Sequence, residues 1–276
     1  MFTLNCKGKL LVLEKPLLMG IINATPDSFY EGSRFSGVDK IAEQAEKMLN
    51  HGADMLDIGG QSSRPGSNPV SVDEEMKRVI PAIEAIVKKS PETIISIDTF
   101  YAKSAAEAVA AGASIVNDIS AGSMDHNMLS TVSGLNVPYV LMHLKGTPQT
   151  MQHNPVYENV VREVLDFFIK KTDELKRAGI KDVIIDPGFG FGKTIAHNFE
   201  MLKNLSVFKM LDKPILLGVS RKSTIYKTLG NTIEESLNGT TVLNTIGLMN
   251  GASILRVHDV KEAKEAITLF TAMQQK

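Results

Sequence analysis

The stretch HGADMLDIG, residues 51–59, decides the fold, because the same arrangement returns twice more along the chain. It is repeated by AGASIVNDI, residues 111–119, and by RAGIKDVIID, residues 177–186. In each phrase the end of a helical pattern is followed by a glycine, a short polar step and an apolar run. Glycine accepts the left-handed conformation that caps a helix C-terminus, and the apolar run is typical of a buried strand. Each phrase therefore predicts a helix that turns directly into a strand.

Working outward from these phrases, eight short apolar runs read as buried strands. They are Leu17–Ile22, Met55–Ile58, Thr93–Ile97, Ser114–Val116, Val137–Leu141, Val183–Ile185, Ile215–Leu217 and Ser253–Leu255. Eight helical patterns alternate with them: Val38–Asn50, Val72–Lys89, Ala102–Ala111, His126–Ser133, Tyr157–Ala178, Phe199–Phe208, Glu234–Met249 and Glu262–Met273. Strict alternation indicates parallel strands with crossover helices. Eight such units favour an α/β fold of the closed (β/α)8 TIM-barrel type, with a doubly wound sheet as the alternative. Residues 2–14 predict a short hairpin around Lys7-Gly8-Lys9, beside or under the barrel.

The bulk composition narrows the class of protein. The chain has 276 residues and an ordinary share of apolar residues, 43 %, and it contains no dividing linker, so we expect one domain spanning residues 1–276. A net charge of −1 argues against a nucleic-acid partner. The single cysteine, Cys6, fits a reducing compartment. With neither a signal-peptide pattern nor a membrane-length apolar run, the sequence predicts a cytoplasmic protein that does not associate with membranes.

Polar residues follow every predicted strand. They are Asn23, Asp57, Asp98, Asn117 with Asp118, His143, Asp186, the run from Ser220 to Ser223, and Arg256 with His258. In a barrel of this type the C-terminal strand ends meet at one mouth, where the active site lies. Acids and amides suit the donors and acceptors of a flat heterocycle, and Arg, Lys and His suit a phosphate. The residue types therefore predict a site for an anionic, phosphate-bearing heterocycle.

Three loops that follow predicted strands lie at the same end of the predicted barrel as these polar residues. The segments 23–37 and 59–69 are long and rich in Gly, Ser, Asn and Pro, as lids often are. The third, IIDPGFGFGKT at residues 184–194, ends like a phosphate-binding P-loop but has Pro187 where that motif needs its first glycine. We therefore expect this strand to present Asp186 to a heterocycle.

Eight motifs in order resemble the dihydropteroate synthase family, the folate-pathway enzymes that sulfonamides target. They are NATPDSF, DIGGQSSRPG, SIDTF, VNDI, MHLKGTPQTMQ, DPGFGFGK, GVSRKS and RVHDV, within roughly residues 17–260. The resemblance implies a (β/α)8 barrel and a Mg²⁺-dependent transferase. Such an enzyme joins 6-hydroxymethyl-7,8-dihydropterin diphosphate to 4-aminobenzoate, releasing diphosphate and 7,8-dihydropteroate. It also implies a homodimer formed through helices late in the chain.

The resemblance assigns residues by motif position. Catalytic roles fall to Asp98, Arg64 and Lys222. The implied pterin-binding residues are Asp98, Asn117, Met142, Asp186, Phe191, Lys222 and Arg256. The resemblance thus implies that Lys222, rather than Lys193, is the lysine that contacts the heterocycle. The diphosphate end takes Asn23, Arg256 and His258, with Asn23 also as the metal ligand. The 4-aminobenzoate residues are Phe29, Ser63, Arg64, Pro65, Phe191 and Ser223.

The implied reaction breaks the bond to diphosphate first, and the arylamine then attacks a resonance-stabilised pterin cation. Two positions depart from the family, which commonly has an acid at Gln61 and threonine at Ser63. A methyltetrahydrofolate-type methyltransferase and a pterin-binding protein without activity are the alternatives. The first has no need of SRKS or the RPG loop, and the second need not keep Asp98, Arg64, Lys222 and His258. Outside the site, we expect Asp57 and Asp118 to hydrogen-bond neighbouring loops and His143 to orient a loop.

Overall fold

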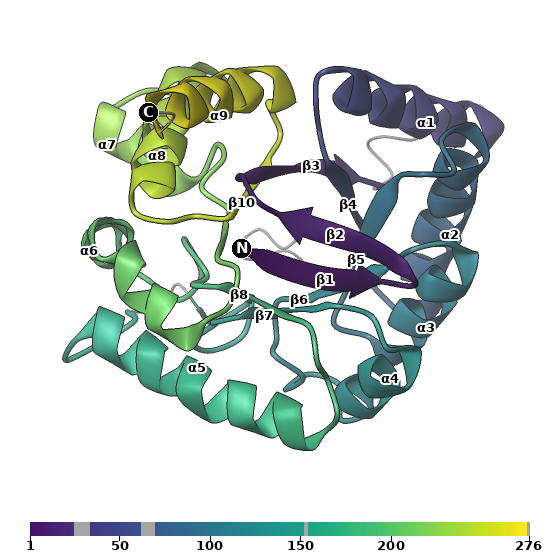
Figure 1. Ribbon diagram of the computed structural model, residues 1–276, viewed down its shortest axis with the longest axis horizontal. Coiled ribbons are helices and arrows are strands. Elements are labelled where there is room, and N and C mark those ends of the chain that lie inside the picture. Colours follow the sequence, from purple (N-terminus) through teal and green to yellow (C-terminus); the bar gives the residue numbers. More distant parts are fainter. Residues whose placement is uncertain (25–33, 62–69, 152–153, 275–276) are drawn as a thin grey trace.

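Eight parallel strands form a barrel that helices surround in this computed structural model, which describes residues 1–24, 34–61, 70–151 and 154–274 (Figure 1). The strand order is β8-β7-β6-β5-β4-β3-β10-β9, and a parallel bridge between Ile185 and Ile215 joins the last strand to the first. The barrel strands are β3 (Leu17–Asn23), β4 (Met55–Gly59), β5 (Ile94–Asp98), β6 (Ile115–Asp118), β7 (Tyr139–Met142), β8 (Val183–Asp186), β9 (Leu216–Leu217) and β10 (Ile254–Val257). The predicted (β/α)8 barrel is confirmed.

The helices follow the predicted alternation, with two corrections. They are α1 (Arg34–Asn50), α2 (Val72–Lys89), α3 (Ala102–Ala111), α4 (Met128–Leu135), α5 (Val160–Arg177), α6 (Ile195–Lys203), α7 (Ser223–Leu229), α8 (Leu237–Met249) and α9 (Val260–Gln274), with 3-10 turns η2 (Leu205–Leu211) and η3 (Glu234–Ser236). The prediction of one helix over Phe199–Phe208 was wrong. Thr194 starts α6 earlier, because its side chain accepts a hydrogen bond from the His197 N–H and the His197 ring accepts one from the Thr194 N–H.

The second correction concerns the segment after β9. The single helix predicted over Glu234–Met249 is a short turn, η3, followed by α8, and α7 precedes both. Gly230 ends α7 in the left-handed conformation, with φ 69°. The barrel therefore has two helices between β9 and β10, and the first of them begins at the mouth.

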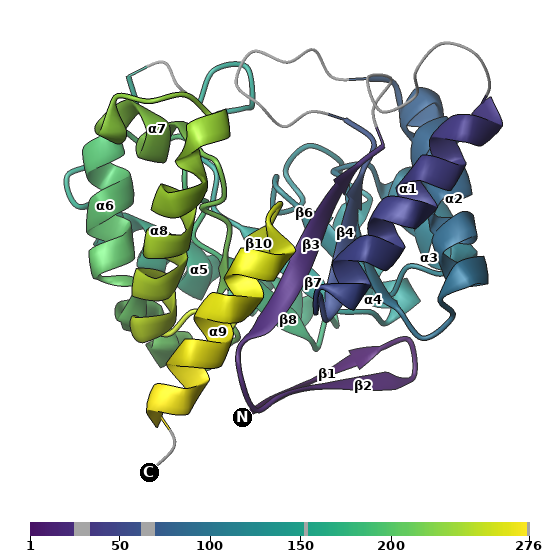
Figure 2. The same ribbon diagram turned by 90° about the horizontal axis from the view of Figure 1, so that it is seen from above.

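The predicted hairpin closes the bottom of the barrel. Strands β1 (Phe2–Cys6) and β2 (Lys9–Leu13) pair antiparallel, and Figure 2 shows them lying across one end of the barrel. Their buried side chains pack with inward-facing residues from the lower part of the barrel strands. This floor cluster contains Leu4, Cys6, Leu11, Leu13, Leu17, Met19, Met55, Ile115, Val140, Ile184, Leu216 and Ile254. The hairpin therefore keeps water out of the end opposite the mouth.

Alternation along each strand converts this apolar floor into a polar mouth. Side chains two residues apart on a strand face the same side, so the residue two positions after a floor residue also points inward. By this rule Met55 is followed by Asp57, Ile115 by Asn117, Ile184 by Asp186 and Ile254 by Arg256. The intervening residues face outward and join the core between strands and helices, as Leu56, Ile185 and Leu255 do. Strand period alone thus brings the functional residue types into one layer.

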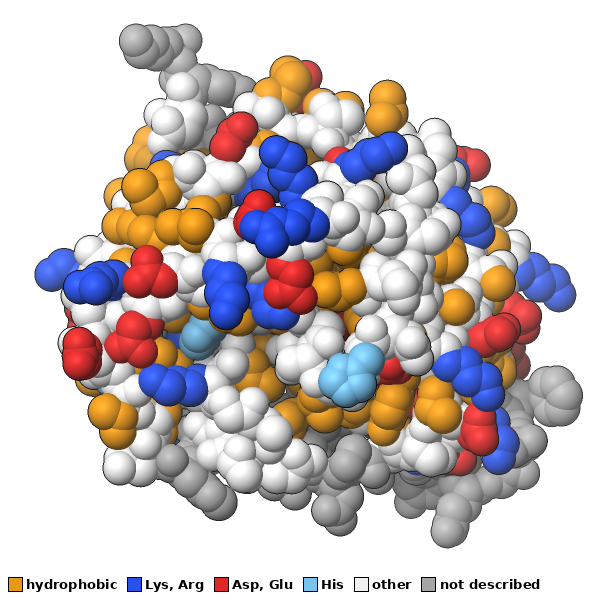
Figure 3. Space-filling view, turned by 90° about the horizontal axis from the view of Figure 1, so that it is seen from below, with side chains coloured by type: hydrophobic (Ala, Val, Ile, Leu, Met, Phe, Trp, Pro, Cys, Tyr) orange, Lys and Arg blue, Asp and Glu red, His pale blue; other side chains and the backbone are white. Residues whose placement is uncertain are grey.

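The outer surface carries charges of both signs. On the face in Figure 3, Lys and Arg side chains lie next to Asp and Glu side chains, as a net charge of −1 allows. Among the residues described, no helix is both long enough and apolar enough to cross a bilayer.

Candidate active site

Four polar side chains from four strands meet in the mouth of the barrel. Asp57 Oδ2 accepts hydrogen bonds from Arg256 Nε at 2.6 Å and from Asn117 Nδ2 at 3.0 Å. Asp98 Oδ2 accepts a second guanidinium bond, from Arg256 Nη2 at 2.7 Å. Arg256 therefore lies between two carboxylates, and its guanidinium plane is fixed by two hydrogen bonds.

The prediction that Asp57 binds a neighbouring loop was wrong. Its side chain is fully buried and holds Arg256, while its other oxygen, Oδ1, has no hydrogen-bond partner within the described part of the chain. The signal that could have found it is strand alternation, because Asp57 stands two residues after the floor residue Met55. Asp57 is a site residue that supports the others from below.

The neighbouring charges shift the pKa of Arg256 and of Asp98. Burial opposes the charged form of Arg256, but Asp57 and Asp98 together prevail and raise its pKa. Burial raises the pKa of Asp98 to about 7, with Arg256 opposing and Asp57 reinforcing the rise. Asp98 is thus an acid that can change protonation near neutral pH at the place where a ligand would bind.

Asp186 and Lys222 form the opposite side of the mouth. Asp186 ends β8, and its Oδ1 accepts the Gly188 N–H at 2.7 Å, which leaves Oδ2 to meet a ligand. Burial raises the pKa of Asp186, and Lys222 is the main group that opposes the rise. Burial likewise lowers the pKa of Lys222 to about 8, against the attraction of Asp186. Each group therefore depends on the other to stay charged.

Lys222 is held over the loop that follows β8. Its Nζ donates to the Phe189 carbonyl and lies 4.6 Å from the centroid of the Phe191 ring. A Cβ added at Gly218 would lie 3.8 Å from Lys222 Nζ and 3.9 Å from Arg256 Cβ. A side chain at position 218 would thus occupy the space between the two cations, and glycine keeps that space open.

An apolar cluster, which we call the apolar wall, follows the strand ends next to these polar groups. Phe100, Ile119 and Met142 form a small buried cluster, against which Tyr101, Leu144 and Phe191 pack. Met142 is the register partner of Asp186 on the neighbouring strand. Apolar surface beside a few fixed polar groups is the usual lining of a small-molecule site.

Two of the three residues expected at the diphosphate end, Asn23 and His258, lie at the exposed rim, whereas Arg256 lies inside the mouth. Asn23 ends β3, and His258 follows β10. Ser220 Oγ accepts the His258 backbone N–H at 3.2 Å and lies 3.0 Å from Nδ1 of the ring. The hydroxyl therefore contacts both the backbone and the ring of His258, and it fixes the orientation of the imidazole.

The aminobenzoate residues are only partly described. Ser223 is the exposed first residue of α7, and Phe191 is half-buried beside Lys222. Phe29, Ser63, Arg64 and Pro65 lie outside the described residues, as do large parts of both loops predicted as lids.

Gln61, the departure that the structure does describe, meets a buried acid. Its Nε2 donates to Glu75 Oε1 at 2.8 Å, and Thr99 Oγ1 donates to Glu75 Oε2 at 2.6 Å. Burial raises the pKa of Glu75, and these donors moderate the rise. An acid at position 61 would place a second carboxyl group against Glu75, whereas the amide of Gln61 donates a hydrogen bond to it.

Two residues set aside in the sequence organise loops. Asp118 accepts the backbone N–H groups of Ser120 and Gly122 and the Tyr139 hydroxyl, which confirms its predicted role. His143 lies behind the loop after β8, where Nδ1 is 2.9 Å from the buried Nζ of Lys193. The burial of Lys193 had no signal in the local sequence.

The donor set does not include a metal cage. Within the described residues, no cluster of three or more His, Cys, Asp or Glu side chains could hold a metal ion. The amide oxygen of Asn23 is a hard donor at the rim. A hard cation here would take its remaining ligands from phosphate oxygens and water.

Comparison with known proteins gives a consistent family. The family described as "Pterin binding enzyme" matches residues 19–258. The chain is 43 % identical to the dihydropteroate synthase of Haemophilus influenzae over 271 residues, which cover 98 % of each chain. It is 41 % identical to the enzyme of that name from Escherichia coli K12, with 98 % of this chain and 95 % of the relative covered.

Solved structures agree with the sequence matches. A Xanthomonas albilineans dihydropteroate synthase with 4-aminobenzoic acid superimposes with a TM-score of 0.92 at 39 % identity, covering 99 % of this chain and 98 % of the other. The enzyme from that organism in complex with 7,8-dihydropteroate gives 0.89 at 37 % identity and covers all of both chains.

Proposed function

The chain belongs to the pterin-binding enzyme family and, within it, to the dihydropteroate synthases, and on that premise we propose how its residues carry out the condensation. The reaction joins 6-hydroxymethyl-7,8-dihydropterin diphosphate to 4-aminobenzoate and yields 7,8-dihydropteroate and diphosphate. The observation that carries the proposal is the polar layer of the mouth. There, two acids, an amide and Lys222 lie beside an apolar wall, and we assign the pterin ring to a slot between them.

The pterin ring lies in this slot. Its 2-amino group and ring N–H are donors, and Asp186 Oδ2 is the acceptor available to them, since Oδ1 already accepts Gly188. Lys222 donates to the pterin's acceptor edge, and Asn117 keeps its carbonyl oxygen for the ring because its amide nitrogen donates to Asp57. Met142 and Phe191 cover the ring, and Arg256 lies against its face. Asp57 and Asp98 hold the guanidinium of Arg256 in place for this contact.

Departure of diphosphate leaves positive charge on the pterin. Asp98 lies in the mouth with one oxygen bound to Arg256, so its second oxygen can face the cation. Fixed charges aimed at a developing charge are the strongest general device of catalysis. His258 at the rim binds the leaving diphosphate, and Arg256 reaches it from inside the mouth.

Mg²⁺ fits this end as a partner of the substrate. Asn23 would hold it through its amide oxygen, and the substrate's phosphates would supply the other oxygens. When bound, the ion would neutralise charge on the diphosphate and so ease its departure.

The arylamine of 4-aminobenzoate then attacks the methylene carbon. A neutral arylamine is nucleophilic without a strong base, and the product loses its extra proton to water or to the departing diphosphate. We assign the substrate's carboxylate to Ser223, the exposed first residue of α7. The other side of the aminobenzoate ring is assigned to Phe29, Ser63, Arg64 and Pro65. Arg64 is also assigned a catalytic role.

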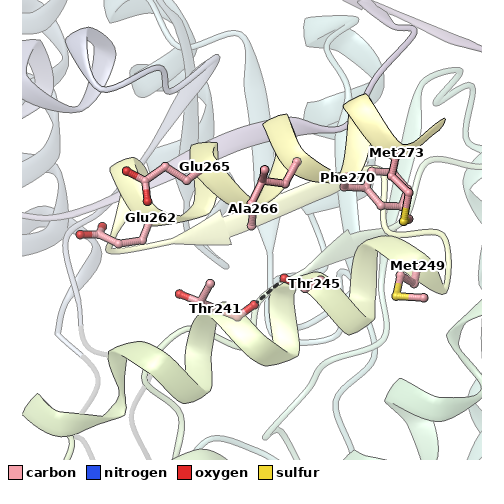
Figure 4. A pocket seen from close by; sticks show the side chains of 9 residues that line it. Thr241, Thr245, Met249, Glu262, Glu265, Ala266, Phe270 and Met273 are labelled. Carbon is pink, nitrogen blue, oxygen red and sulfur yellow. Dashed lines mark hydrogen bonds between the residues drawn. The ribbon is translucent and has the colours of Figure 1, made fainter. Parts of the chain in front are cut away.

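Homodimerisation is proposed through α8 and α9. A groove of about 350 Å³ runs between these helices, lined by Thr241, Thr245, Met249, Glu262, Glu265, Ala266, Leu269, Phe270 and Met273. Figure 4 shows Met249 on one helix and Phe270 and Met273 on the other at the same end of the groove. Met249, Leu269 and Met273 are each more than 60 % exposed, which is unusual for large apolar side chains on a free surface. Substitution of Leu269 by Glu should shift the protein from dimer to monomer in analytical ultracentrifugation.

We further propose a single domain over residues 1–276 in the cytoplasm. The hairpin and the barrel share one buried cluster, which supports one folding unit. The single cysteine, Cys6, is a buried free thiol, which suits a reducing compartment.

An assay of the purified protein for product and diphosphate tests the proposed activity. With pterin diphosphate, Mg²⁺ and 4-aminobenzoate the protein should form 7,8-dihydropteroate and release one diphosphate per product. Omission of 4-aminobenzoate should abolish product formation. No product above the enzyme-free background would refute the proposal.

A further inference from the structure

Lys193 is a buried lysine to which the proposed reaction gives no task. Its side chain is 2 % exposed, and its ammonium group has three acceptors within 3.0 Å, with the His143 carbonyl farther away at 3.5 Å. Nζ lies 2.9 Å from His143 Nδ1, 3.0 Å from the Gly188 carbonyl and 3.0 Å from the Phe191 carbonyl. An ammonium so fully satisfied inside the protein is an anchor for the backbone around it.

The backbone that Lys193 anchors is the glycine-rich turn after β8, whose glycines can adopt many conformations. Gly188, Gly190 and Gly192 all have positive φ, at 68°, 85° and 60°. A Cβ at Gly188 would lie 1.9 Å from the His143 carbonyl oxygen, and one at Gly192 would lie 2.5 Å from that of Lys145. Alternate glycines are flexible in the unfolded chain, so the turn needs side-chain contacts to select one conformation. Lys193 supplies two of them from within the same loop, and its contact with His143 ties that loop to the segment after β7.

Each carbonyl that Lys193 holds belongs to a residue tied to the mouth. Gly188 donates its N–H to Asp186 Oδ1 at 2.7 Å while its carbonyl accepts from Lys193. Phe191 accepts from Lys193 through its backbone, and its ring lies under the ammonium of Lys222. Between the two, the Phe189 carbonyl accepts from Lys222. One buried ammonium therefore fixes the turn on which both Asp186 and Lys222 rest.

We propose that Lys193 is a positioning residue that fixes the turn of residues 188–191 and thereby sets the Asp186 carboxylate and the Lys222 ammonium for the pterin. This inference rests on the proposed pterin site, and it extends that site to a residue that never touches substrate. Lysine suits the task because its acceptors converge on a point, whereas the planar fork of arginine needs acceptors side by side.

The charges around the turn support a second effect of the same residue. Three cations oppose the burial of Asp186, namely Lys222, Arg256 and Lys193, and each lowers the pKa of that carboxyl. Burial lowers the pKa of Lys193 to about 7, with Asp186 opposing and Lys222 adding to the fall. Burial, with Lys193 and Lys145 nearby, lowers the pKa of His143 to about 2, so the ring stays a neutral acceptor. Removing Lys193 should therefore make Asp186 easier to protonate.

The test compares Lys193→Met with Lys203→Met, which removes an exposed lysine from the end of α6. Calorimetric titration with 6-hydroxymethyl-7,8-dihydropterin, which lacks the leaving group, measures binding of the pterin alone. We expect Lys193→Met to bind about tenfold more weakly, roughly the loss of one hydrogen bond to a charged group. The low-pH limb of binding should move to higher pH, because Asp186 has lost a neighbouring cation; a purely structural role would leave that limb in place. Lys203→Met should behave as wild type in both respects.

The outcomes separate this inference from the proposed function. Failure of the wild-type protein to bind the pterin would refute the site itself and the inference with it. Normal pterin binding by the wild type, together with a folded Lys193→Met protein of equal affinity and unchanged low-pH limb, would refute only the role of Lys193. If Lys193→Met does not fold, His143→Leu replaces it, since that change removes one acceptor and leaves the ammonium in place. Binding several times weaker than wild type would support the inference, and wild-type affinity would overturn it.

Discussion

Replacing Asp57 by asparagine should loosen Arg256 without emptying the space between the strands. The substitution keeps the shape of the side chain and one oxygen, but it removes the negative charge that Arg256 Nε contacts at 2.6 Å. Asp98 is then the carboxylate that remains hydrogen-bonded to Arg256. Since Asp57 is fully buried, no water replaces the lost carboxylate at low cost.

The expected size of the effect follows from these contacts. Leaving a buried charge without its only partner costs about 3–5 kcal/mol, whereas a hydrogen bond to a charged group contributes about 1.5–3 kcal/mol. Asp98 remains and an amide oxygen replaces the carboxylate, so we expect the lower range, about 2–3 kcal/mol in the free energy of unfolding. For a chain of this size that lowers Tm by about 5–10 °C. Pterin affinity should also fall by about tenfold, because Arg256 loses its fixed orientation.

Asp173→Asn is the matched control. Asp173 also pairs with an arginine, Arg177, but on the surface of α5, with side-chain exposures of 55 % and 79 %. Removing that charge should change stability by no more than about 0.5 kcal/mol and leave pterin binding unaltered. Urea denaturation and pterin titration of both variants provide the measurement. If Asp57→Asn is as stable as Asp173→Asn and binds pterin normally, the supporting role of Asp57 is refuted.

Three further substitutions test the mouth. Asp186→Asn should weaken pterin binding by at least about 30-fold, because an amide N–H₂ then faces the pterin's donors. The fold should survive, since burial already disfavours the Asp186 charge; an unchanged titration isotherm would contradict our placement of the donor edge. Lys222→Met should weaken binding about tenfold and move its low-pH limb upward, as Lys222 is the main group that keeps Asp186 ionised; a fixed limb would count against that pairing. Gln61→Glu should destabilise the protein by about 1–2 kcal/mol at pH 8 and by less at pH 5. The pKa of Glu75 in the folded protein is already raised above its unfolded value, so the stability it contributes at low pH is lost as pH rises, and a second acid enlarges that loss. Equal urea midpoints for Gln61→Glu and wild type at pH 8 would show that Glu75 tolerates the charge.

Local patterns in the sequence predict most of the barrel. The bounds of α2 and α3 agree to the residue with the expected helices, and the hairpin turns where Lys7-Gly8-Lys9 predicts. These elements are determined by nearby residues, such as Ser71, whose side chain accepts the Glu74 N–H at the start of α2. A helix is expected to begin at Ser223, where α7 does begin, but with only 7 residues α7 is too short to show a clear apolar period and its extent could not be predicted.

The site likewise contains residues that local sequence predicts and a residue that it does not. Asp98, Asn117, Asp186 and Arg256 follow apolar runs directly, so their position at the mouth could be read from the sequence. Lys193 could not be read in this way, because its burial depends on His143, fifty positions away in the chain. Its Gly-Lys-Thr context suggested a phosphate loop, but its acceptors are backbone carbonyls and an imidazole, and Thr194 caps α6. The Gly-Lys-Thr sequence thus resembles a P-loop, but here the lysine holds a turn and the threonine caps a helix.

The most direct test of the central claim is a crystal structure of this protein with 7,8-dihydropteroate. We predict that the pterin ring lies in the mouth between Lys222 and the Met142 wall, with its 2-amino group and ring N–H within hydrogen-bond distance of the Asp186 carboxylate. The aminobenzoate portion should extend toward Ser223. A pterin bound elsewhere, or turned so that no donor reaches Asp186, would contradict the account.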